Sequence, residues 1–173
     1  RTGGTMIGSH NYRGKIGDIE VSTESQRTIK PTGAGVYSTT VGANSFTNGT
    51  VATSTGALNV ISSDYDRNDA SKAPKNFGAT INGTLNSIES ATSSDNNAGI
   101  ANAVVGTANR TANSNGTLVF GAGNEITNSI ANIDRSSMSG SPFAGPSSIT
   151  SMANKVRAAV KSSNSGGATM AFG

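Results

Sequence analysis

The 173-residue chain contains no cysteine and no tryptophan, and it has only three leucines, five phenylalanines and three tyrosines. The absence of cysteine excludes a disulfide scaffold and any thiolate metal site. With so few large apolar side chains, a thick two-layer core is hard to fill. The composition therefore favours a thin structure, in which a folded monomer would bury little apolar surface.

Charge is also scarce, because only 13% of the residues are Asp, Glu, Lys or Arg and the formal net charge is +3. Disorder would require a high net charge as well as a low apolar content, so the composition does not favour it. The Lys and Arg residues form no basic patch interleaved with aromatics, which argues against nucleic-acid binding. No apolar run approaches the roughly 18 residues of a membrane-spanning helix.

Small and polar residues dominate instead, since Gly, Ser, Thr and Asn make up 86 of the 173 residues. Among the apolar residues, 12 isoleucines and 10 valines far outnumber leucine. Branched Cβ atoms pack well on pleated strands and lose rotamer freedom in helices. The sequence therefore predicts an all-β fold.

A short phrase recurs along the chain, in which an extended run is closed by an apolar residue and a glycine. It occurs at residues 4–8, 38–42, 102–106, 117–121 and 169–173, with a weaker copy at 76–78. In four copies an asparagine follows the glycine after two or three residues. These positions are predicted to be structural corners: Gly8, Asn11, Gly42, Asn44, Gly78, Gly106, Asn109, Gly121 and Asn124.

A second series lies between these copies and has an asparagine two residues before an isoleucine, at 58–61, 85–88 and 127–130. Asn-Gly-Thr triplets at 48–50, 82–84 and 115–117 add turns that tolerate positive φ. The spacings of the phrase glycines predict a rung of about 14–15 residues, with a double rung and insertions elsewhere.

Together these patterns favour a β-solenoid, in which each rung pairs with the rungs above and below it and Val and Ile point inward. Asparagine side chains would then stack between rungs in hydrogen-bonded ladders. The alternative is an antiparallel β-sandwich with Asn-Gly hairpins, which the turns alone fit equally well. The recurring phrase favours the solenoid, because a sandwich does not need it.

The stretch Ile100–Asn109 and the stretch Asn115–Ile130 resemble consecutive rungs of a trimeric autotransporter adhesin head of the YadA-like type. The resemblance is best over residues 99–133. Looser matches lie at residues 3–21, 34–51, 55–64 and 76–90. The resemblance implies a left-handed parallel β-roll, three of which pack around a threefold axis. Such a homotrimer would supply the core that one chain lacks.

The resemblance further implies adhesion at the bacterial cell surface, with outer-membrane anchoring through a C-terminal region that is not in this chain. The implied partners are host receptors, such as CEACAM-type immunoglobulin domains, or extracellular matrix proteins, and no cofactor is implied. The alternatives are a phage tail-fibre or tailspike receptor-binding segment, with or without glycan-cleaving activity, and a structural spacer between other heads.

We expect head rungs over residues 1–133 and a further rung at 166–173, with a loop insertion at 62–75. That loop holds the candidate ligand-binding residues Asp64, Tyr65, Asp66, Arg67 and Asn68. Its alternating acidic residues resemble the start of a calcium loop, but Asp69 replaces the required glycine and Lys75 replaces the bidentate glutamate. We therefore expect no metal site there.

A second insertion, at residues 134–165, lacks the rung phrase. Ile149, Met152, Val156 and Val160 recur at helical spacing, which predicts a short helix near residues 148–162. Ser147 or Ser148 is the predicted N-cap, and Lys155, Arg157 and Lys161 are predicted on the opposite side. Such a helix could contact a receptor or cover an end of the roll, but its one-sided apolar stripe favours a packed connector.

Catalysis is not expected, since His10 is the sole histidine and lies in a corner phrase. The spacing marks no pair of the ten carboxylates as facing inward, as a glycan-cleaving acid pair would require.

Overall fold

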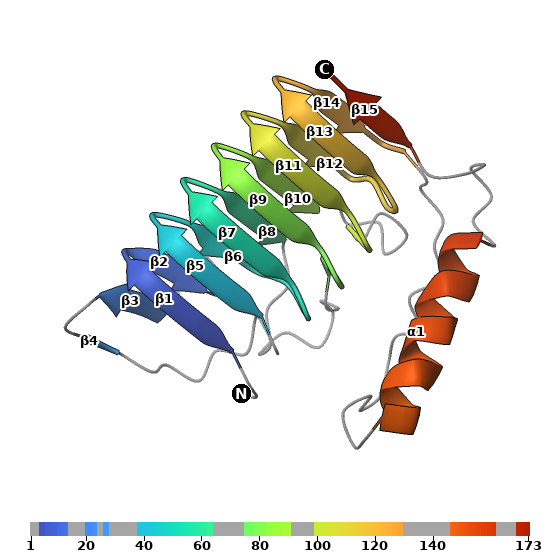
Figure 1. The fold of residues 1–173 in the computed structure, drawn as a ribbon, viewed down its shortest axis with the longest axis horizontal. Helices are drawn as coiled ribbons and strands as arrows, with labels where there is room; N and C mark the ends of the chain where they lie inside the picture. Colours follow the sequence, from blue (N-terminus) through green and yellow to red (C-terminus); the bar gives the residue numbers. More distant parts are fainter. Residues whose placement is uncertain are drawn as a thin grey trace.

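The computed structural model is a stack of rungs, each made of one strand in a first sheet followed by one strand in a second (Figure 1). The structure describes residues 4–13, 20–23, 26–27, 38–63, 75–90, 99–129, 146–161 and 169–173. Within those ranges the chain forms strands β1 to β15 and the helix α1.

The first sheet is parallel throughout and has the order β1-β5-β7-β9-β11-β13-β15. Its strands are β1 (Thr5–Ser9), β5 (Thr39–Ala43), β7 (Thr53–Ala57), β9 (Thr80–Thr84), β11 (Ala103–Thr107), β13 (Leu118–Ala122) and β15 (Met170–Phe172). Parallel neighbours require crossover connections, and here the second sheet supplies them.

The second sheet has the order β14-β12-β10-β8-β6-β2-β3-β4. Its strands are β2 (Asn11–Arg13), β3 (Glu20–Thr23), β4 (Gln26–Arg27), β6 (Phe46–Thr47), β8 (Val60–Ser63), β10 (Ser87–Ser90), β12 (Arg110–Ala112) and β14 (Glu125–Thr127). Pairing is parallel from β14 to β2, and the pairs β2–β3 and β3–β4 are antiparallel. The predicted all-β fold with stacked parallel rungs is thus confirmed, and the antiparallel sandwich is wrong.

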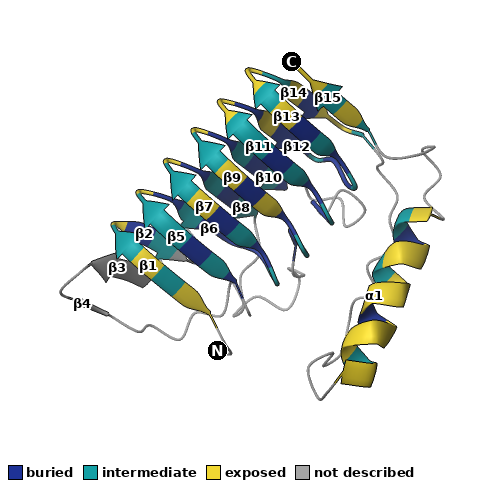
Figure 2. Cartoon of the chain, viewed as in Figure 1, coloured by how far each residue is buried: buried dark blue, intermediate teal, exposed yellow. Residues whose placement is uncertain are grey.

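The core is a single thin layer between the two sheets (Figure 2). One apolar cluster fills it: Ala52, Ile61, Ala79, Ile81, Ile88, Val104, Val119 and Ile126. Toward the N-terminal rungs the inward positions become polar, and Thr40 Oγ1 donates to Thr47 Oγ1 across the roll at 2.9 Å. Branched and small residues suit this spacing because each rung brings only one or two side chains from each sheet inward.

The chain turns from the first to the second sheet at what we call the glycine edge, a column formed by Gly8, Gly42, Gly56, Gly83, Gly106 and Gly121. All have φ between 110° and 140°. A Cβ atom built on any of them would lie 1.7–1.9 Å from the carbonyl oxygen of the glycine in the next rung. Only glycine fits where successive backbones approach this closely.

The predicted corner at Gly78 is wrong. Gly78 lies at the opposite edge of the roll, with φ of 68° and no atom within 4 Å of a built Cβ. The rungs between Gly42 and Gly106 are instead closed by Gly56 and Gly83, so the second series at 58–61 and 85–88 belongs to the first series. The sequence pattern did not reveal Gly56 and Gly83 as members of the first series, because Thr55 and Asn82 precede them where the phrase has an apolar residue.

An asparagine ladder runs beside the glycines, as the solenoid interpretation predicted. The Oδ1 atoms of Asn59, Asn86 and Asn109 each accept from the backbone N–H of the next ladder asparagine, at 3.1, 3.0 and 3.0 Å. The Nδ2 groups of Asn59, Asn86 and Asn109 donate to the carbonyl of the glycine in the next rung at 2.7–2.8 Å. The ladder therefore satisfies backbone groups that the turns would leave unpaired.

The predicted corner Asn44 lies one residue before the ladder. It has φ of 49° at the tip of its turn, while Ser45 occupies the ladder position. Asn11 Oδ1 accepts from the Ser45 N–H at 3.2 Å, and Ser45 Oγ accepts from the Asn59 N–H at 3.2 Å. A serine continues the chain of acceptors, but it has no amide to reach the next glycine.

The opposite side of the roll, which we call the insertion edge, is where the chain passes from the second sheet to the next first-sheet strand. Five residues suffice for this between β6 and β7 and between β12 and β13. The strands β3 and β4, which belong to one longer connection, extend the second sheet beyond β2. The longer connections likewise run from a second-sheet strand to the next first-sheet strand, and the one with α1 follows this edge (Figure 1). The glycine edge cannot host them because its backbones are in contact from rung to rung.

Candidate functional site

The predicted ligand-binding residues Asp64, Tyr65, Asp66, Arg67 and Asn68 lie outside the described residues. His10 is the exposed tip of its turn, with φ of 56°, and its Nδ1 is 2.5 Å from Ser9 Oγ. In the part of the chain that the structure describes, no three His, Asp or Glu side chains gather closely enough to hold a metal ion. No helix within that same part is long and apolar enough to cross a membrane.

Three charged residues of the second sheet form a link across three rungs. Arg110 on β12 pairs with Glu125 on β14 and with Glu89 on β10. The hydrogen bond to Glu125 is the largest cause that raises the pKa of the Arg110 guanidinium, and the hydrogen bond to Glu89 is the next. Because all three side chains are solvent-accessible, the trio is a surface ion-pair ladder that supports the stack modestly.

Outward side chains of the first sheet form what we call the apolar face. Successive rungs align Ile7, Val41, Thr55, Asn82, Val105, Phe120 and Phe172 in one column. Ile7 is 57% exposed, Phe120 is 54% exposed and Phe172 is 66% exposed. The rings of Phe120 and Phe172 lie 6.3 Å apart between centroids. Apolar side chains that adjoin on a sheet surface, as Val105, Phe120 and Phe172 do, mark an interaction site rather than scattered exposure.

The apolar face weakens in the middle, where the column holds Thr55 and Asn82. In those two rungs the tips of the glycine edge are Leu58 and Leu85, with φ of 57° and 61°, and they are 46% and 54% exposed. A bulky residue in the left-handed region costs about 1–2 kcal/mol. The two leucines thus expose apolar surface at the glycine edge of the same two rungs whose residues in the column, Thr55 and Asn82, are polar.

Helix α1 (Pro146–Lys161) packs along the insertion edge. Its Ala159 is buried against Ile100, with Phe77 and Val160 partly buried around them. The predicted helix is confirmed, but its start differs, because Pro146 is the first helical residue and the predicted caps Ser147 and Ser148 lie inside the first turn. The helix contacts the edge of its own roll rather than an end of the stack.

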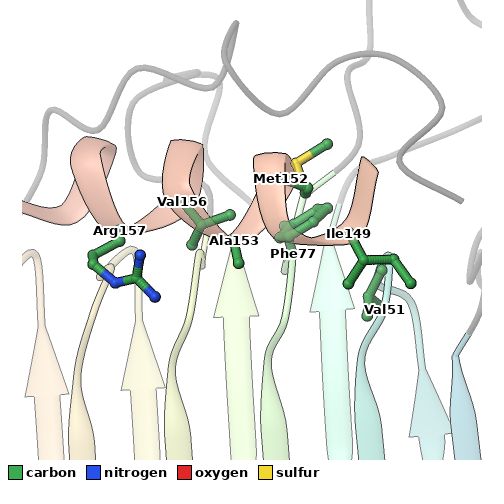
Figure 3. A pocket seen from close by; sticks show the side chains of 7 residues that line it. All are labelled: Val51, Phe77, Ile149, Met152, Ala153, Val156 and Arg157. Carbon is green, nitrogen blue, oxygen red and sulfur yellow. The ribbon is translucent and has the colours of Figure 1, made fainter. Parts of the chain in front are cut away.

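A groove of about 400 Å³ lies between α1 and the insertion edge (Figure 3). Its walls are Ile149, Met152, Ala153, Val156 and Arg157 from the helix, and Val51 and Phe77 from the turns of the roll. Arg157 was predicted on the side of α1 away from the apolar stripe, and this is wrong, because it lines the groove. Lys155 and Lys161 are exposed.

Sequence reasoning missed both surfaces as specific sites. The signal for the apolar face lies in the phrase itself, where two apolar residues precede each glycine in copies such as Val119-Phe120. Alternation along a strand sends only one of them inward: Val119 is buried, and Phe120 is exposed. The groove had no such signal, because it joins turns around residues 51 and 77 to a helix far along the chain.

Comparison of the chain with family models, with curated proteins and with solved structures returns no match. Two surfaces of the described residues are candidates for binding: the apolar face of the first sheet and the groove beside α1. They lie on different sides of the roll, since one is a sheet face and the other follows the insertion edge (Figure 1).

Proposed function

We propose that this chain is a head segment of a bacterial trimeric surface adhesin, a homotrimer of left-handed β-rolls that binds host surface protein. The observation that carries the proposal is the apolar face. Ile7, Phe120, Met170 and Phe172 are each more than half exposed on a single chain whose own core is one thin layer.

The thin core explains why association would matter for this fold. Several inward positions are polar, among them Thr40, Thr47 and Ser54, so the N-terminal rungs bury little apolar area within the chain. Burying the apolar face against neighbouring copies would add an apolar layer that the monomer lacks. A threefold arrangement gives each copy the same environment and closes without leaving an unpaired face.

The adhesive mechanism follows from that assembly. Three identical heads on one stalk present three equivalent binding surfaces at fixed separation, so modest affinity at one surface becomes durable attachment to immobile ligands. The rigid glycine and asparagine ladders suit this role, because a solenoid holds such surfaces in place along its length. Extracellular matrix proteins and host receptors such as CEACAM-type immunoglobulin domains are the ligand classes we propose, with anchoring to the outer membrane through a region C-terminal to the head.

Assembly is tested by measuring the solution mass by light scattering, on the chain alone and on a fusion to a trimerising coiled coil. We expect a trimer in both. Phe120→Asp should convert the unfused chain to monomer, while Thr127→Asp, at an exposed position of the second sheet, should not. A wild-type chain that stays a well-folded monomer at high concentration would overturn the trimeric assembly.

Function is tested with the fused trimer flowed over surfaces coated with matrix proteins or with CEACAM-type ectodomains. We expect attachment to at least one of these surfaces and much weaker attachment of the monomeric variant. Binding confined to bacterial polysaccharide, with or without its cleavage, would instead identify a phage fibre segment.

A further inference from the structure

The groove beside α1 contains a strained residue. Two residues before β7, β9, β11 and β13, the insertion edge turns through positive φ at Val51, Gly78, Ala101 and Gly116, with φ of 54°, 68°, 56° and 59°. A β-branched side chain is the least favourable choice for this conformation, and the other three rungs use glycine or alanine. The Val51 side chain projects into the groove (Figure 3). Strain held at one position of a repeated turn points to a role for that side chain.

The helical wall of the groove is one continuous face. Ile149, Met152, Ala153, Val156 and Arg157 recur at the three- and four-residue spacing that aligns side chains along a helix. Eight residues separate the first and last of these, which corresponds to about 12 Å along the axis. An extended peptide covers that length with about four residues. Ile149 is 57% exposed at one end, and Arg157 is at the other.

The charge of the groove is unbalanced. Arg157 is the charged residue among its lining residues, and α1 carries Lys155, Arg157 and Lys161 without any Asp or Glu. Among the described residues, Arg157 Nη1 donates to the neutral Asn154 Oδ1 at 2.6 Å. A guanidinium has five N–H donors, so Arg157 keeps donors for a carboxylate, the group it binds best in a two-pronged geometry.

We propose that this groove binds an extended segment of a partner protein that carries two apolar side chains followed, about four residues away, by a carboxylate. The apolar side chains lie against Val51, Phe77 and Ile149, and the carboxylate accepts hydrogen bonds from Arg157. The groove volume suits a few side chains and not a folded element. The inference rests on the proposed adhesive function and names the chemistry of its ligand.

The test uses the intact chain and a fluorescein-labelled peptide with two leucines and one glutamate at this spacing. A matched peptide has glutamine in place of glutamate. Fluorescence anisotropy should show the glutamate peptide binding about tenfold more tightly. Arg157→Gln should abolish that difference and leave binding of the glutamine peptide unchanged, whereas Lys155→Gln, on the same helix but outside the groove lining, should preserve most of it.

The variant Val51→Gly distinguishes an effect on peptide affinity from an effect on the stability of the fold. It copies the residue that occupies the same turn position at Gly78 and Gly116, so the chain should unfold at a higher temperature than wild type. It also removes an apolar wall, so both peptides should bind several-fold more weakly. Lower affinity in a more stable variant cannot come from misfolding.

Three results would overturn the proposal: equal binding of the two peptides to wild type, equal effects of Arg157→Gln and Lys155→Gln, or unchanged affinity in Val51→Gly. Binding of decanoate with no binding of either peptide would reassign the groove to an acyl ligand.

Adhesion of the fused trimer is scored separately. If wild type and Arg157→Gln attach to host surfaces equally well, the groove inference fails and the adhesin proposal stands. If the peptide binds but the trimer attaches to no host surface, the groove inference stands and the adhesin proposal fails.

Discussion

Gly56 and Gly83 lie on adjacent rungs so closely that a Cβ atom on Gly56 would be 1.9 Å from the carbonyl oxygen of Gly83. The asparagine that follows each glycine uses the same proximity, since Asn59 Nδ2 donates to that carbonyl at 2.8 Å. Close stacking and the amide ladder are thus one arrangement, in which glycine provides the space and asparagine the hydrogen bonds.

The first prediction concerns this stacking. Gly83→Ala places a methyl group 1.9 Å from the Gly106 carbonyl oxygen at a φ of 140°, and the contact is with backbone that cannot move without opening the stack. We expect a loss of about 4 kcal/mol or more, or failure to fold. Gly123→Ala is the control, because its Cβ meets no atom within 4 Å and only the φ of 70° opposes it, at about 1 kcal/mol. Urea unfolding followed by circular dichroism measures both, and equal losses would contradict the stacking argument.

The second prediction concerns the ladder. Asn86→Ala removes the acceptor of the Asn109 N–H and the donor to the Gly106 carbonyl, so we expect a loss of about 2–4 kcal/mol in the free energy of unfolding. Ser45→Asn fills the gap in the ladder and should raise stability by about 1 kcal/mol. If Ser45→Asn is destabilising, Ser45 is not equivalent to the ladder asparagines.

A third prediction concerns Ser54, which points into the core between Thr40 and Ile81. Within the described residues its Oγ atom is buried and has no hydrogen-bond partner. Ser54→Ala should therefore raise the free energy of unfolding by about 1 kcal/mol. Thr40→Ala breaks the hydrogen bond to Thr47 and should lower the free energy of unfolding. Opposite signs for the two variants would show that the hydrogen bond matters, because a general effect of removing core hydroxyls would have the same sign in both.

The fourth prediction concerns the leucine tips. Leu58→Asn copies the residue at the tip of the preceding rung, Asn44, which tolerates positive φ better than leucine does. We expect the chain's own unfolding midpoint to rise at low protein concentration, where it is monomeric. In the proposed trimer the same change should raise the dissociation constant several-fold, measured by sedimentation. An unchanged dissociation constant would place the leucine tips outside the subunit interface.

Much of the fold could be predicted from local sequence, because a solenoid repeats one local solution. The phrase ending in Val119-Phe120-Gly121 predicted a strand and a corner, and both are present. The prediction failed at Gly78, missed Gly56, and gave Gly83 only as part of an Asn-Gly-Thr turn outside the phrase. A phrase glycine is recognised only when apolar residues precede it, and Thr55 and Asn82 do not meet that condition. The helix was predicted from its apolar spacing, but the groove-facing side chain of Arg157 was assigned to the wrong side.

By itself, the sequence determined the secondary structure, the parallel stacking and the asparagine ladder, because these depend on contacts between residues of one repeat and the next. Only the tertiary structure decided which of the two apolar residues in each phrase faces outward, and that β3 and β4 extend the second sheet beyond β2. It also decided that α1 packs beside Val51 and Phe77. That packing joins residues separated by many rungs, and a local pattern carries no information about a neighbour that the chain reaches only after folding.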